Sequence, residues 1–183
     1  MKTRAIILKK QNTNEYDQLV GCYTQELGKM TALAKSILKK NSIQAMHLDL
    51  FNLVEFELVN GNSFPIITGA QVENTHLKLK SSIQNISAAF AIGDYIDKIV
   101  FDYLRDDELW EFLINVLKKL DSDDNDIGKT LKDNQEKLLK ILGYHTEIKN
   151  QTTVLDLNYV FEQIAGRPLK SIKFFHRAQS MLI

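Results

Sequence analysis

Alternating apolar and polar positions predict a series of short β-strands in the first 75 residues. Between residues 29 and 35, for example, Met30, Ala32 and Ala34 share one face, and this period of two is typical of strands. The dipeptide Asn60-Gly61 suits a hairpin turn, because both residues tolerate positive φ. The pattern predicts strands over 3–8, 19–24, 29–35, 51–59 and 64–72.

From Leu77 onward the spacing of apolar residues lengthens to three or four positions. A series that begins at Ile83 and continues through Phe90 to Tyr103 follows this spacing, which places its members on one buried helix face. The same pattern predicts further helices over 109–120, 130–142, 155–164 and 169–182.

The change from one pattern to the other predicts an α+β chain with a boundary near residues 75–80. Five short strands with almost no helix between them favour a small barrel. A barrel with basic residues on its strands and loops is typical of an oligonucleotide-binding fold (OB-fold). We therefore expect a five-stranded OB-fold barrel, the DNA-binding domain, over 1–76 and an all-helical domain over 77–183.

Composition and cysteine usage exclude several classes of protein. Of the 183 residues, 44% are hydrophobic and 25% are charged, which is typical of a folded domain and argues against disorder. The single cysteine, Cys22, rules out an internal disulfide and a cysteine-rich zinc site, and we expect it to be a buried thiol. No apolar run reaches the roughly 18 residues that suggest a membrane span. We expect a cytoplasmic protein.

No arrangement of residues points to catalysis or to a cofactor. The loop 121–126 alternates like a calcium-binding EF-hand loop, but Asp126 stands at the glycine position and Lys132 at the glutamate position of that motif. The run Asp106-Asp107-Glu108 could hold the metal of a nuclease, but the start of a helix explains these carboxylates better. We therefore expect a binding protein without metal or cofactor, and an enzyme is the third hypothesis.

A formal net charge of zero conceals an uneven distribution. Residues 1–46 hold eight cations and three anions, 94–126 hold four cations and eleven anions, and 167–177 hold four cations and no anion. Such asymmetry favours a polyanion partner for the basic segments, although solvated faces often carry uneven charge as well. Aromatic side chains can stack on unpaired bases. The candidates are Tyr16, Tyr23, Phe51 and Phe64, although such residues are more often core residues than stacking platforms, because small barrels need large apolar side chains.

Eight short segments follow one another in an order that is similar to one protein family. They are 3–10, 15–20, 23–29, 32–35, 50–58, 69–73, 137–144 and 166–171. The series resembles the bacterial recombination mediator RecO family, for example in the segment Ala32-Leu33-Ala34-Lys35, which is similar to that family's ALAKG motif. No single motif is highly specific, but the ordered series is, and it covers nearly the whole chain.

The resemblance implies an N-terminal OB-fold barrel, a helical C-terminal domain and a role in DNA repair and recombination after DNA damage. RecO-like proteins bind single- and double-stranded DNA, anneal complementary strands and act with RecR to load RecA. They also contact the acidic C-terminal tail of single-strand DNA-binding protein. We therefore expect an association with the nucleoid.

Carried over to this chain, the resemblance implies two sets of basic site residues. The candidates for DNA binding are Arg4, Lys9, Lys10, Lys29, Lys35, Lys39 and Lys40. The candidates for the acidic tail are Arg167, Lys170 and Lys173, with a solvated basic helix as the alternative interpretation.

Three departures from the family pattern bear on function. The cysteine zinc module of many relatives is reduced here to the polar stretch 149–153, so no zinc is expected. The basic loop is thinner, because Leu38 and Asn41 stand where basic residues are common. The chain is also short for the family. The alternative function is therefore a protein-docking scaffold of the recombination machinery with little DNA affinity of its own.

Overall fold

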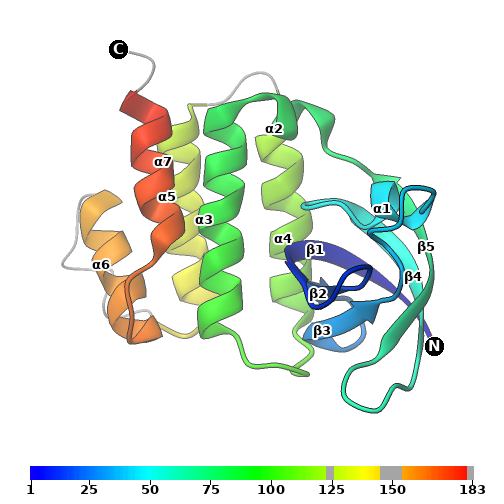
Figure 1. Cartoon of the computed structure of the whole chain (residues 1–183). Coiled ribbons are helices and arrows are strands. Elements are labelled where there is room, and N and C mark those ends of the chain that lie inside the picture. Colours follow the sequence, from blue (N-terminus) through cyan, green and yellow to red (C-terminus); the bar gives the residue numbers. More distant parts are fainter. Residues whose placement is uncertain (123–125, 145–153, 181–183) are drawn as a thin grey trace. The chain divides into compact units, whose positions relative to one another are not determined.

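The computed structural model describes residues 1–122, 126–144 and 154–180 (Figure 1). The chain divides into two compact units. The first comprises Met1–Thr75 and Phe101–Trp110, and the second comprises His76–Val100 and Glu111–Ile183. The first unit contains all the strands, and the second contains most of the helical residues.

Five strands of the first unit form a closed barrel in the order β1-β2-β3-β5-β4. All neighbouring strands are antiparallel except β3 and β5, which pair in parallel only at Leu33–Ile66 and Ala34–Ile67. The expected N-terminal OB-fold barrel followed by helices is confirmed. The strands are β1 (Lys2–Asn12), β2 (Gln18–Thr24), β3 (Gly28–Ala34), β4 (Leu53–Val59) and β5 (Ile66–Asn74).

The barrel interior is filled by side chains from every strand. Its buried cluster includes Ile7, Val20, Met30, Phe56 and Ile67, which lie on inward-facing positions of the alternating pattern. Full burial of one such side chain stabilises a fold by about 1.5–3 kcal/mol. Cys22 belongs to the same cluster as a free thiol, and burial raises its pKa to about 12, so it is an unreactive core residue.

The start of the fourth strand and one short helix differ from the predictions. Phe51 has a φ of 60° and precedes β4, because its N–H donates to Ile7 O (2.8 Å) as the chain turns into the barrel. The missed helix is α1 (Gln44–His47). His47 Nδ1 accepts the N–H of Val72 at 3.2 Å, which attaches the helix to β5. Four residues are too few to show a helical period.

Residues 101–110 group with the barrel, although they lie within the range expected for the helical domain. The N–H of Tyr103 donates to Lys29 O (2.8 Å), and the hydroxyl of Tyr23 donates to Asp106 O (3.2 Å). A Cβ at Gly28 would lie 2.1 Å from Leu104 O, so glycine permits this close approach. The helix predicted to continue to Tyr103 therefore ends at Ile99.

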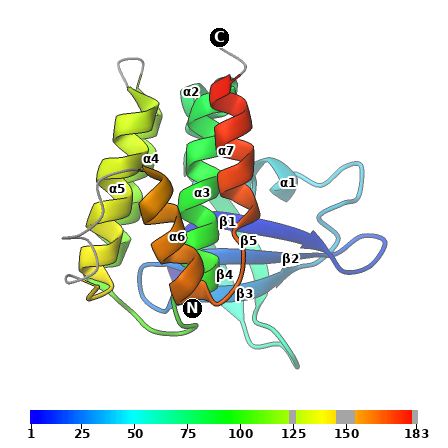
Figure 2. The same cartoon turned by 90° about the vertical axis from the view of Figure 1, so that its left-hand side faces the viewer.

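In the second unit α2, α5, α6 and α7 pack against α3, which lies beside α7 (Figure 2). Phe90 of α3 meets Phe174 of α7 edge to face, with ring centroids 6.1 Å apart, and Ser171 Oγ donates to Asp94 Oδ2 at 2.8 Å. The bounds are α2 (Leu77–Ser81), α3 (Ile83–Ile99), α4 (Asp107–Leu120), α5 (Ile127–Ile141), α6 (Val154–Ala165) and α7 (Lys170–Ser180). Within the described residues, no helix combines the length and the apolar character that crossing a membrane requires.

A buried polar network joins three helices of the second unit. The hydroxyl of Tyr95 donates to Asn158 Oδ1 at 2.9 Å, and Gln135 Nε2 donates to the Tyr95 hydroxyl at 2.6 Å and to Asn158 Oδ1 at 2.5 Å. The Tyr95 ring stacks on Phe161 at 3.9 Å. These contacts fix the register of α3, α5 and α6, because a buried polar group without its partner is costly.

Candidate nucleic-acid interface

A hollow of about 660 Å³ lies on the barrel, where the chain leaves β3 and where β5 begins. It is lined by residues of the segment 34–44 together with Ile66, Ile67 and Thr68, and we call it the basic groove. Ile37 and Ile67 are buried, whereas Lys35 and Lys39 are exposed. The lining of the groove therefore combines apolar and uncharged polar side chains with two exposed cations.

Hydrogen bonds to the β1–β2 connection hold the segment 35–40 in place. Asp17 Oδ1 accepts the N–H of Ser36 at 2.7 Å, and the N–H of Leu38 donates to Tyr16 O at 3.0 Å. Ser36 has a φ of 55°, so this turn needs the support that Asp17 supplies. The hydrogen bond from the Asn14 side chain and then that from Ser36 lower the pKa of Asp17, and the charges of Lys35 and Lys39 add to the effect.

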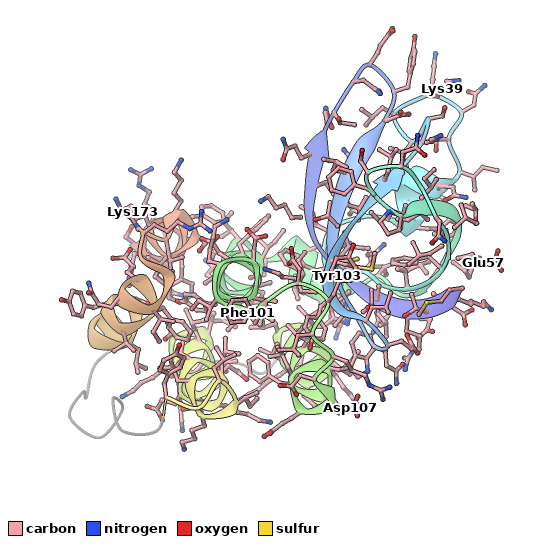
Figure 3. All side chains as sticks on the ribbon, turned by 90° about the horizontal axis from the view of Figure 1, so that it is seen from below. Lys39, Glu57, Phe101, Tyr103, Asp107 and Lys173 are labelled. Atoms are coloured by element: carbon pink, nitrogen blue, oxygen red, sulfur yellow. The ribbon has the colours of Figure 1, made fainter. Side chains whose placement is uncertain are left out.

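Three of the predicted DNA-binding residues gather on this segment and form no salt bridge with any described residue. Lys35, Lys39 and Lys40 are exposed, and none of them forms a salt bridge within the part of the chain that the structure describes. Lys39 lies on the outer side of the segment (Figure 3), with its Nζ 5.4 Å from the centre of the Tyr16 ring. These ammonium groups are available to phosphates.

Three other predicted DNA-binding residues are already paired with acids. Arg4 forms a bidentate pair with Glu73, with N–O distances of 2.7–3.1 Å, and its guanidinium lies 5.8 Å from the Trp110 ring centre. Lys10 contacts Asp49 at 2.9 Å and Lys29 contacts Asp102 at 3.2 Å. Lys9 is exposed on β1 opposite Gly21. The predicted set is therefore divided between paired side chains and the cluster at the groove.

The four aromatic candidates separate by exposure. Tyr23 and Phe51 are core residues with 0% and 1% of their surface exposed. Tyr16 is 42% exposed and lies in the β1–β2 connection, and Phe64 is 37% exposed and lies in the β4–β5 connection. Of the four candidates, only Tyr16 and Phe64 are exposed enough to contact a ligand.

The residues that shape the groove were not among those predicted from the sequence. Ile43 and Ile66 belong to its lining, and Asn14 and Asp17 organise its support. The spacing Asn14-x-x-Asp17 between two strands was an available signal, because such side chains bond to nearby backbone groups in turns. The apolar lining carried no separate signal, since it resembles any other core-facing pattern.

The C-terminal basic residues occupy the second unit. Arg167, which precedes α7, and Lys170 and Lys173 of α7 are exposed, while Ile172 and Phe175 of α7 are buried. Lys170 and Lys173 lie one turn apart on α7, with the partly exposed Phe174 beside them. Arg167 also borders a hollow of about 320 Å³ before α7.

The acidic residues near α4 act as helix-start residues. Asp106 Oδ1 accepts the N–H of Leu109 at 3.0 Å, and Asp107 pairs with Arg105 at 2.8 Å. Among the described residues, no group of three or more His, Cys, Asp or Glu side chains is arranged to hold a metal ion. Residues 123–125 of the acidic loop and the stretch 149–153 lie outside the described residues.

Comparison with known proteins agrees with this architecture. The family described as "Recombination protein O N terminal" matches residues 1–76. The DNA repair protein RecO of Dehalococcoides mccartyi is 28% identical over 174 residues, which cover 90% of this chain and 67% of the relative. That of Thermoanaerobacter sp. is 25% identical over 150 residues, covering 82% and 60% respectively.

A third RecO relative also aligns along most of this chain. All three relatives are longer than the chain. The DNA repair protein RecO of Clostridium novyi is 28% identical over 171 residues, covering 86% of this chain and 65% of the relative. The chain thus spans about three-fifths to two-thirds of the length of these relatives. Residues 1–76, which hold the closed five-stranded barrel, match the RecO N-terminal family, and the chain is similar to DNA repair protein RecO of several bacteria along most of its length.

Proposed function

We propose that this chain is a DNA repair protein that binds single- and double-stranded DNA through the basic groove. The observation that carries the proposal is the cluster of Lys35, Lys39 and Lys40, which has no salt bridge within the described residues. The relatives are named DNA repair protein RecO, and this name supports a role in DNA repair.

The geometry supports binding that depends on phosphates and not on base sequence. Lysine side chains release counterions when they neutralise phosphates, so affinity falls steeply with salt. Phosphate contacts position a strand but carry no sequence information. A cluster that neutralises the phosphates of two complementary strands lowers their repulsion, and we propose that the chain anneals such strands in this way.

We also propose that the exposed basic residues of the second unit contact acidic protein partners. Arg167, Lys170 and Lys173 have the charge that the acidic C-terminal tail of single-strand DNA-binding protein requires, and Phe174 offers an apolar contact. In this proposal, RecR acts with the chain to load RecA onto the strand that the barrel has bound.

The test is fluorescence anisotropy of a labelled single-stranded oligonucleotide, titrated at several salt concentrations. Changing Lys35, Lys39 and Lys40 together to Ala should lower the slope of log affinity against log salt by about 2, because three phosphate contacts are lost. A matched variant changes Lys118, Lys129 and Lys140, which are exposed on α4 and α5. It removes the same charge and should keep the wild-type slope.

The ion pairs of Arg4, Lys10 and Lys29 favour the second function, a docking scaffold with little DNA affinity. Absence of binding by the wild type near 50 mM salt, where phosphate contacts are strong, would refute the DNA-binding proposal and support the scaffold. Equal slopes for the two triple variants would show that the DNA binds outside the basic groove.

A further inference from the structure

The β1–β2 connection presents an aromatic ring on a firmly held backbone. Asn14 Oδ1 accepts the N–H of Tyr16 at 3.0 Å and that of Asp17 at 2.7 Å. On the other side, Tyr16 O accepts the N–H of Leu38 at 3.0 Å. The Tyr16 side chain is nevertheless 42% exposed. The backbone is thus fixed, while the ring contributes little to the core.

The exposed ring lies beside the cations of the basic groove. The Nζ of Lys39 is 5.4 Å from the centre of the Tyr16 ring, within the range of a cation–π contact. Of the four aromatic candidates, Tyr16 alone combines exposure with such a lysine among the described residues. A strand whose phosphates reach Lys39 therefore brings its bases close to an aromatic face.

We propose that Tyr16 is a stacking platform for an unpaired base of single-stranded DNA, and that Lys39 moves from the ring to a phosphate of the same strand. This inference rests on the proposed function and deepens it, because it names the ligand as a strand with free bases. In a duplex the bases already stack on one another, so Tyr16 adds affinity only for single strands. Every base has a π-face, so stacking does not require a particular sequence.

The test compares two oligonucleotides with equal numbers of phosphates. One is an oligomer of thymidines and the other carries abasic sugars in place of all nucleosides. For the wild type, the thymidine strand should bind about tenfold more tightly, since base stacking on one aromatic residue is worth roughly that ratio. The change Tyr16→Ala should bring the ratio close to one and leave the affinities for the abasic strand and for a duplex within twofold of wild type.

Four further variants separate stacking from other effects. Tyr16→Phe keeps the ring and should keep the ratio, whereas Tyr16→Leu keeps apolar bulk without a π-face and should lose it. Tyr159→Ala removes a tyrosine that is 59% exposed on α6 and should leave every affinity unchanged. Lys39→Ala should weaken both strands by a similar factor, because it removes a phosphate contact.

The outcomes distinguish this inference from the proposed function. If Tyr16→Ala still binds the thymidine strand about tenfold more tightly than the abasic strand, Tyr16 is not the stacking platform. A ratio of these two affinities near one for the wild type would refute the proposal as well. If the Lys35, Lys39 and Lys40 triple variant still loses affinity in that case, the proposed groove survives without the platform. If neither strand binds the wild type, the proposed function itself fails.

Discussion

At the scale of single residues, Asp17 supports the basic groove through its charge. Hydrogen bonds, first from the Asn14 side chain and then from Ser36, lower its pKa below the ordinary value. A carboxylate with a depressed pKa in the folded state contributes stability above its unfolded pKa, about 3.9, and loses that contribution as pH falls through the folded value.

We therefore predict that Asp17→Ala lowers the urea midpoint at pH 7 and that the difference from wild type shrinks when the pH falls to about 3. Urea titrations at the two pH values measure this difference. Asp17→Asn is the control, because its amide oxygen can still accept the Ser36 N–H without a titrating charge. A difference that grows at low pH would contradict the assignment.

A second residue-scale prediction concerns Gly28, which has a φ of 70°. Its replacement by Ala would strain the backbone and place a Cβ 2.1 Å from Leu104 O, so we expect a loss of at least about 2 kcal/mol of stability. Gly69 is the matched control in the same barrel, since a Cβ there meets nothing within 4 Å. Denaturant unfolding of Gly28→Ala and Gly69→Ala measures both, and equal stabilities would contradict this account of the 101–110 segment.

At the scale of elements, the network of Tyr95, Gln135 and Asn158 ties α3, α5 and α6 together. Tyr95→Phe removes one hydroxyl but keeps the ring that stacks on Phe161. We predict a loss of about 1–3 kcal/mol, because polar atoms of two buried partners lose a hydrogen bond. Tyr159→Phe, on the exposed face of α6, should change stability by less than about 0.5 kcal/mol. Thermal unfolding of both variants provides the comparison.

The sequence predicted the long elements well because their apolar periods reflect burial on one face. All five strands and the helices α3 to α7 follow from this signal. It failed where tertiary contacts decide the conformation. Tyr103 continues the apolar helical series, yet backbone bonds from the 101–110 segment to β3 end the helix. The helix α1 is held by the hydrogen bond that its own His47 side chain accepts from the Val72 N–H of β5, and it has no period of its own.

At the scale of the whole molecule, sequence charge indicated a nucleic-acid partner but not where it binds. The pairing of Arg4 with Glu73 joins residues 69 positions apart, and that of Lys29 with Asp102 joins different elements. Such pairs depend on the folded arrangement, so they are invisible in a local pattern. The structure describes seven expected DNA-binding residues and leaves Lys35, Lys39 and Lys40 as the exposed cluster. The division into a DNA-binding domain over 1–76 and a helical domain over 77–183 stays a prediction.

The measurement that tests the central claim most directly is lysine labelling of the unaltered protein with and without a single-stranded oligonucleotide. An amine-reactive reagent and mass spectrometry report the modification of each lysine. At about 50 mM salt, where phosphate contacts are strong, the account predicts that DNA protects Lys35, Lys39 and Lys40 and leaves Lys118, Lys129 and Lys140 as reactive as before. Protection confined to Lys170 and Lys173, or equal labelling of all lysines with DNA bound, would contradict it.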